Sequence, residues 1–230
     1  MPRRMSTEGA AVSLGAAAVS AIFTGRILSR WLYRRKPYQL AWSVGLGLYA
    51  VAAAMQFLAE AYSWTVLTYK AYYLVAAVLV AVLGIGSALL LNRRVGFAFA
   101  LYTAVVFAGF AIAVAGTTVN EAALASAIPV AGNALPDSVR IFSPMFTIPG
   151  SVALIGIAVY SYWRTRLPFN LWIGVGGLIV AAGASLTRLN VSPWALYLGE
   201  FLGIAVMFWG FLASQELTRT KAAAAAQVPT

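Results

Sequence analysis

Cysteine and histidine are both absent from the 230 residues of this sequence. Without cysteine the chain has no disulfide, no thiolate nucleophile, no thiolate zinc site and no cysteine-ligated cluster. Without histidine it cannot bind haem, zinc or di-iron through imidazole, which excludes the membrane hydrolases and desaturases built on histidine clusters. We therefore expect neither a metal site nor a cofactor.

Acidic residues are also scarce, and the six that are present are Glu8, Glu60, Glu121, Asp137, Glu200 and Glu216. No two of them lie close enough along the chain to suggest a pair of metal-binding carboxylates. Catalysis would have to use a lone carboxylate, a lysine, a tyrosine or a serine such as Ser185, and the spacing of these residues favours no such mechanism. We predict that the protein is not an enzyme.

Apolar residues dominate the composition, with 62% hydrophobic and 10% charged residues. This is too apolar for a soluble domain, so the sequence predicts an integral membrane protein whose first partner is the lipid bilayer. The formal charge of +10 would suggest nucleic-acid binding in a soluble protein. In membrane proteins, however, basic residues accumulate in cytoplasmic loops. We expect a multi-pass protein of the plasma or inner membrane that binds no nucleic acid.

Seven apolar runs are long enough to cross a hydrocarbon core about 30 Å thick. They lie near residues 10–29, 38–62, 65–91, 95–115, 146–163, 170–188 and 194–214. The sequence therefore predicts an all-α protein with a single seven-helix membrane domain over residues 1–230. A long loop at 116–145 and a short tail at 215–230 complete the chain.

Basic residues near the ends of these runs predict the orientation. One side of the membrane collects Arg30, Arg34, Arg35, Lys36, Arg93, Arg94, Arg164, Arg166, Arg219 and Lys221. The other side holds fewer basic residues, although Arg3 and Arg4 argue for the opposite orientation. We predict that the first side is cytoplasmic. The N-terminus and the 116–145 loop would then lie outside, and the 215–230 tail inside.

A short phrase occurs twice, as RKPYQLAW at residues 35–42 and RLPFNLWI at residues 166–173. The match extends to Gly45 with Gly176 and, after a slip of one residue, to Trp64 with Trp194. Helices 1, 2 and 3 then correspond to helices 5, 6 and 7, which predicts a 3+1+3 layout of parallel pseudo-repeats. Chance similarity between apolar segments explains these matches equally well.

This layout resembles that of the SWEET sugar transporters, which have seven helices, the N-terminus outside and parallel repeats. The resemblance covers helix count and repeat order only. The proline-glutamine dipeptide that ends the first helix of each repeat in that family is missing here. The resemblance implies a transporter with its binding site between the two halves.

Charged residues within the spans are the strongest candidates for a site, because an ionisable side chain in a membrane is costly unless it is paired or hydrated. Lys70 follows Trp64 by six residues and Glu200 follows Trp194 by six, which places both about 9 Å inside the outer interface at 1.5 Å per residue. We predict that Lys70 pairs with Glu200 across the two halves. The alternatives are a local ion pair of Lys70 with Glu60, or a lysine that extends outward to the interface.

The same outer layer holds further polar and aromatic candidates, namely Arg188, Tyr69, Tyr73 and Tyr197. A cavity lined by aromatic side chains with a few charged groups is typical of a small-molecule site. An aromatic belt at the membrane interface explains some tyrosines without any ligand. We predict that these residues and the three charges bind or gate a small molecule or ion.

Two further motifs predict local structure. The stretch SPMFTIPG, with Pro144, Pro149 and Gly150, would interrupt or kink the fifth helix and leave backbone carbonyls that need other partners. Gly199 and Gly203 flank Glu200 and would let the last helix approach a neighbour closely.

Three functions fit these features. A transporter or channel for a small solute, with an outward-side pocket and an intramembrane charge pair, fits best. A receptor-like sensor fits seven helices and an outer pocket, but it would need a partner to carry a signal. An accessory subunit of a membrane complex would use the buried charges as contacts, and an oligomer is compatible with all three functions.

Overall fold

The computed structural model describes residues 7–124, 132–189, 191–192 and 194–226, with the side chains of Thr7, Arg188 and residues 215–226 outside the description. These described residues are mostly helical, with no strand among them. The helices are α1 (Thr7–Arg34), α2 (Pro37–Tyr62), α3 (Val66–Leu91), α4 (Arg93–Gly116), α5 (Glu121–Leu124), α6 (Asp137–Arg140), α7 (Phe142–Thr165), α8 (Pro168–Arg188) and α9 (Trp194–Ala226).

Seven of these helices, all except α5 and α6, are long and apolar enough to cross a membrane, which confirms the predicted number of spans. Local signals in the sequence explain where several of them begin. Pro37 and Pro168 open α2 and α8, because proline suits a first helical turn. Thr65 forms a capping box with Thr68 before α3, and the Asn92 side chain accepts two backbone N–H groups at the start of α4.

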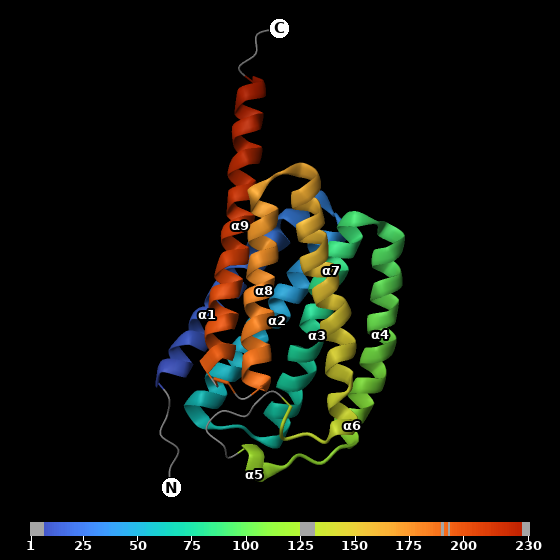
Figure 1. Cartoon of the computed structure of the whole chain (residues 1–230), viewed down its shortest axis with the longest axis vertical. Helices are drawn as coiled ribbons and strands as arrows, with labels where there is room; N and C mark the ends of the chain where they lie inside the picture. The colour runs from blue at the N-terminus through green and yellow to red at the C-terminus, as the bar shows by residue number, and fades with distance from the viewer. Residues whose placement is uncertain (1–6, 125–131, 190, 193, 227–230) are drawn as a thin grey trace.

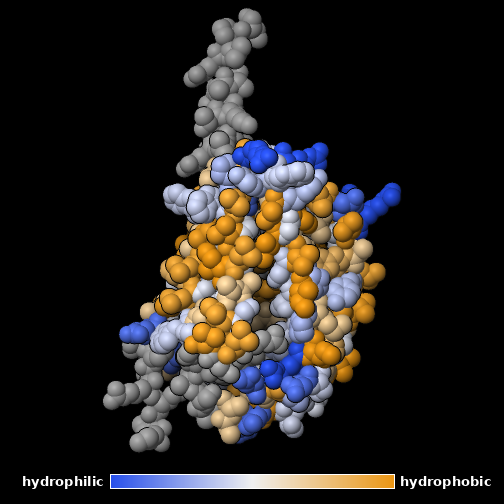
Figure 2. Space-filling view, viewed as in Figure 1, coloured by the Kyte–Doolittle hydropathy of each residue, from blue (hydrophilic) through white to orange (hydrophobic). Residues whose placement is uncertain are grey.

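Six of the spanning helices form a closed ring. Each packs against the next in the order α1, α2, α3, α7, α8, α9, and α9 packs back onto α1 (Figure 1). The remaining span, α4, lies outside this ring against α3 and α7. On the face shown in Figure 2, apolar side chains cover most of the middle and hydrophilic ones gather toward the two ends. We call the end where α1 and α7 finish the basic end, and the end that carries α5 and α6 the loop end.

The predicted close approach at Gly199 and Gly203 is confirmed at the contact between α8 and α9. A Cβ added to Gly199 would lie 2.9 Å from the Cα of Gly183. A Cβ added to Gly203 would lie 2.7 Å from the carbonyl oxygen of Gly176. Both distances are too short for any side chain, so the two backbones touch. This contact holds the part of α9 that carries Glu200 directly against α8.

The proline in α7 leaves the helix uninterrupted, and another helix supplies a donor for the carbonyl that the proline cannot serve. Pro149 lies inside α7 and has no N–H to donate to the carbonyl of Met145. The hydroxyl of Tyr102, on α4, donates to that carbonyl at 3.0 Å. Of the expected break or kink at SPMFTIPG, the break is absent, since α7 runs from Phe142 to Thr165, and the expected free carbonyl is satisfied by a neighbour. This bond also ties α4 to the outside of the ring.

Candidate functional site

The ring encloses a cavity of about 550 Å³. Its lining comes from α2, α3, α7, α8 and α9 and is mostly aliphatic. The polar side chains in the lining are Tyr49, Tyr72, Tyr73, Ser143, Thr147, Ser151, Ser185 and Glu200. Glu200 is thus the one ionisable carboxylate that faces this space among the described residues. A concave apolar site with a few polar groups is the usual composition of a small-molecule site.

Glu200 is held by an amide and has no cationic partner in the described part of the chain. Its Oε1 accepts a hydrogen bond from Nε2 of Gln56 at 3.4 Å, and the same Nε2 donates to the hydroxyl of Tyr72 at 2.8 Å. No described lysine or arginine forms an ion pair with this carboxylate. A carboxylate in an apolar membrane site without a counter-charge is costly, so it is a candidate for binding a ligand.

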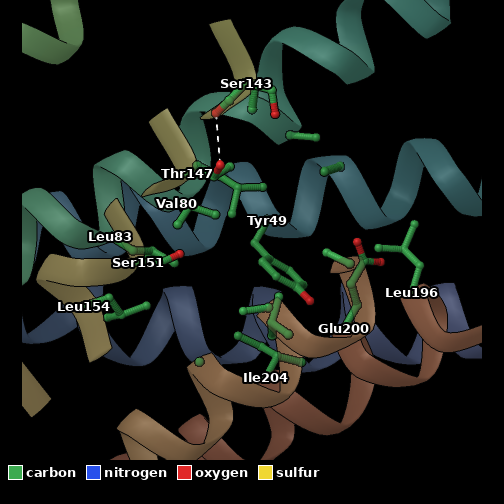
Figure 3. Close-up of a pocket in the computed structure, with 18 of the residues that line it drawn as sticks. Tyr49, Val80, Leu83, Ser143, Thr147, Ser151, Leu154, Leu196, Glu200 and Ile204 are labelled. Atoms are coloured by element: carbon green, nitrogen blue, oxygen red, sulfur yellow. Dashed lines mark hydrogen bonds between the residues drawn. The ribbon is translucent and has the colours of Figure 1, made fainter. Parts of the chain in front are cut away.

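Tyr49 supplies a second polar group without a partner. Its side chain is 5% exposed, and its hydroxyl makes no hydrogen bond to any described residue. Figure 3 shows the Tyr49 ring reaching from α2 and the Glu200 side chain reaching from α9 into the same space. Buried hydroxyls are nearly always hydrogen-bonded in folded proteins, so an unpartnered one at a cavity wall marks a position for a ligand or water.

The predicted ion pair between Lys70 and Glu200 is not formed. The ammonium of Lys70 donates instead to the carbonyl oxygens of Thr117 at 2.7 Å and Ala115 at 3.2 Å. These carbonyls lie at the C-terminal end of α4, where a helix has no backbone donors left for its last oxygens. A cation there also interacts favourably with the helix dipole. Lys70 therefore faces outward to α4, away from the cavity.

The other predicted site residues divide between the cavity and its surroundings. Tyr73 lines the cavity. Tyr197 donates to Oε1 of Glu60 at 2.8 Å, which joins α9 to α2 beside the cavity on the loop-end side. The hydroxyl of Tyr69 accepts from the backbone N–H of Gly132 at 3.2 Å, which fixes the loop end onto α3. The side chain of Arg188 lies outside the described residues.

Several residues of the site were not predicted from the sequence, although signals for them exist. On α2, Tyr49 and Gln56 precede the predicted Glu60 by eleven and four residues, which places all three on one helical face. On α7, Ser143, Thr147 and Ser151 recur every four residues and form a hydroxyl stripe. All three of these α7 residues line the cavity (Figure 3). Polar residues repeated at helical spacing within an apolar span are therefore the sequence signal that indicates these residues.

The cavity is closed at its basic end and open on one side. Leu83, Leu154 and Met207 form its floor, and they belong to a buried apolar cluster that continues to Phe23 and Phe211. On the open side, α7 and α8 touch near their short connection and separate toward the loop end (Figure 1). Ile148 and Val152 of α7 line the cavity and are nevertheless 63% and 68% exposed.

Among the described residues, no group of three histidine, cysteine or acidic side chains could hold a metal ion. In comparisons with known proteins, the chain matches no protein-family model, no curated protein and no solved structure.

Proposed function

We propose that the protein is a membrane carrier that transports a small solute bearing a positive charge, which binds in the ring cavity at Glu200. The observation that carries this proposal is a lone carboxylate at the wall of a 550 Å³ apolar cavity. A solute cation would supply the charge that no described side chain supplies, and the unpartnered hydroxyl of Tyr49 would accept from the same solute. The aromatic faces of Tyr49, Tyr72 and Tyr73 favour a cation in addition.

The arrangement of the ring supports transport by two similar halves. The first triplet (α1, α2, α3) and the second (α7, α8, α9) meet at two contacts, α3 with α7 and α9 with α1. The cavity takes Tyr49 and Tyr72 from the first triplet and Ser151 and Glu200 from the second. Transporters with parallel repeats bind their solute at such an interface and expose it alternately to either side.

The two copies of the repeated phrase support the same division, because they share their local geometry. Arg35 and Arg166 both adopt a left-handed backbone, with φ of 51° and 54°. The N–H of Arg35 donates to the carbonyl of Trp31 and that of Arg166 to the carbonyl of Tyr162, each at 2.7 Å. One extended residue and a proline follow in both copies. We propose that the triplets are pseudo-repeats related by an axis along the membrane normal.

We further propose that the protein resides in the plasma or inner membrane with its basic end in the cytoplasm. The cavity then lies toward the outer side, and the apolar floor around Leu83 and Met207 separates it from the cytoplasm. This arrangement corresponds to an outward-facing carrier whose inner gate is closed. Transport requires a second state in which this floor opens and the present opening of the cavity closes.

A receptor-like sensor is the second candidate, and α9 is the observation that favours it. The membrane-spanning part of α9 ends near Ser214, whereas the helix continues to Ala226 at the basic end (Figure 1). Such an extension offers a rigid connection to a partner that reads the state of the cavity. An accessory subunit stays a prediction, and co-purification of a partner in mild detergent would test it.

The test uses purified protein in liposomes with two probes, choline as a compact hydrophilic cation and ethidium as an aromatic one. We expect wild-type protein to bind and take up at least one of them, and Glu200→Gln to weaken binding about 30-fold or more, since a buried charge pair is lost. Glu60→Gln, which removes a carboxylate outside the cavity, is the matched control. Binding without uptake would identify a sensor, and equal binding by Glu200→Gln would refute the site.

A further inference from the structure

We infer that the ligand of the cavity is a lipophilic organic cation, and that it reaches Glu200 from the lipid bilayer through the gap between α7 and α8. This inference rests on the proposed function, because it assigns the chemical class and the route of the solute bound at Glu200. Three observations carry it: the position of the opening, the cover on the loop end, and the composition of the lining.

The opening faces the side of the bundle. Its rim consists of Ile148 and Val152 on α7 and of Ala184 and Ser185 on α8, all of which line the cavity and are exposed. These residues lie within the candidate membrane spans of their helices. Figure 2 shows the surface hollowed between these two helices and flanked by hydrophobic side chains. In the membrane, a molecule crossing this rim comes from the acyl chains of the leaflet at the loop end.

The helices α7 and α8 are in contact near their connection. A Cβ on Gly177 of α8 would lie 3.1 Å from the Ile155 side chain, which is tighter than most such contacts. Toward the loop end the facing residues of both helices line the cavity instead of packing on each other.

Water from the loop end meets a cover of side chains before it reaches the cavity. Trp64 packs against the rings of Tyr69 and Tyr72 at centroid distances of 5.5 and 5.0 Å. Beside them, the hydrogen bond between Tyr197 and Glu60 ties α9 to α2. These residues cover the cavity on the side of α2, α3 and α9, whereas its lateral side between α7 and α8 is open.

The lining selects a lipophilic cation over a compact ion. A metal ion would need several oxygen ligands at short range, typically six to eight for calcium, and no such group exists among the described residues. A hydrophilic organic cation would lose its hydrating water on entering the cavity. It would gain in return only Glu200 and a few hydroxyls among aliphatic walls, so its burial would be costly. A molecule with an apolar body and one positive group matches both the walls and the carboxylate. The 550 Å³ volume suits a ligand of drug-like size.

The first test measures binding rates of ethidium by its fluorescence in liposomes. Val152→Trp places a large side chain on the rim, and Val105→Trp, on the lipid-exposed face of α4, is the matched control. We expect Val152→Trp to slow binding about tenfold or more while Val105→Trp leaves the rate unchanged. An unchanged rate in Val152→Trp, with the effect of Glu200→Gln intact, would overturn lateral access and leave the proposed function standing.

A second test does not depend on how the introduced tryptophan packs on the rim. Because the chain has no cysteine, Ser151→Cys introduces a single thiol at the cavity wall. We expect a membrane-dissolved maleimide to label this thiol, a charged water-soluble thiol reagent to leave it unlabelled, and ethidium to protect it. Labelling by the water-soluble reagent from the loop end would overturn lateral access. Protection by choline as effective as that by ethidium would overturn the assignment to a lipophilic cation.

Discussion

Lys70 and Glu200 invite comparison, because each lies in a spanning helix six residues after a tryptophan, and yet their surroundings differ. Lys70 donates to two free carbonyls at the end of α4. Glu200 accepts from a single amide and faces a cavity. A membrane helix leaves unused carbonyl acceptors at its C-terminus and unused N–H donors at its N-terminus. Lys70 lies beside such an end, that of α4, whereas Glu200 accepts no hydrogen bond from a backbone N–H among the described residues.

Reversing the charge at Lys70 is expected to give the largest effect on stability. Lys70→Glu would place a carboxylate against the carbonyls of Ala115 and Thr117 and remove two charge-assisted hydrogen bonds. We expect a loss of about 3 kcal/mol or more in the free energy of unfolding. Thermal unfolding in detergent measures it, with Lys70→Arg as the control that retains charge. A Lys70→Glu protein as stable as wild type would show that the lysine does not anchor α4.

Neutralising each charge separately should distinguish the two residues further. Lys70→Met leaves the α4 carbonyls without a donor, and we expect it to cost about 2 kcal/mol of stability. Glu200→Gln keeps the shape and a hydrogen-bonding group beside Gln56, so we expect unfolding within about 0.5 kcal/mol of wild type. Chemical denaturation in detergent gives both values. Equal destabilisation by the two substitutions would mean that Glu200 also has a structural role.

Two tyrosines that link α2 to other helices provide a smaller effect. Tyr197→Phe removes the hydrogen bond to Glu60, and Tyr72→Phe removes the one from Gln56. We expect each substitution to cost about 1 kcal/mol. Only Tyr72→Phe should also weaken ethidium binding, because Tyr72 lines the cavity and Tyr197 does not. Stability and binding measured on the same samples separate the two roles.

The smallest expected effect is the coupling free energy between Lys70 and Glu200 in a double-mutant cycle. A double-mutant cycle of Lys70→Met and Glu200→Gln should be additive within about 0.5 kcal/mol, because the two side chains share no partner. Thermal stability of the two single variants and the double variant gives this value. A coupling well above it would mean that the two charges interact in the solubilised protein.

The sequence predicted the positions of the spans along the chain much better than the directions in which their side chains point. All seven spans, the close contact at Gly199 and the need of Pro149 for an external donor follow from spacing and residue type. The partner of Lys70 could not be predicted in this way, because its position depends on α4 lying outside the ring with its C-terminal end beside α3. The order of the helices in the ring also places α3 and α9 on opposite walls. Lys70 and Glu200 are therefore not neighbours, although each follows a tryptophan at the same spacing. The hydroxyl stripe on α7 was detectable, since its period is helical.

The contact between α9 and α1 determines how the cavity comes into being. Phe208 and Phe211 pack on Phe23 at centroid distances of 5.0 and 5.1 Å, and a Cβ on Gly15 would lie 3.0 Å from Phe201. The chain is synthesised from its N-terminus, so α9 is the last of the described helices to be made. Without α9 between α8 and α1 the ring is incomplete, and the cavity residues of the other helices line a groove that is open to lipid. The helix that carries Glu200 thus completes the cavity last. A cation already bound in the groove would favour the packing of α9 against α8 and α1.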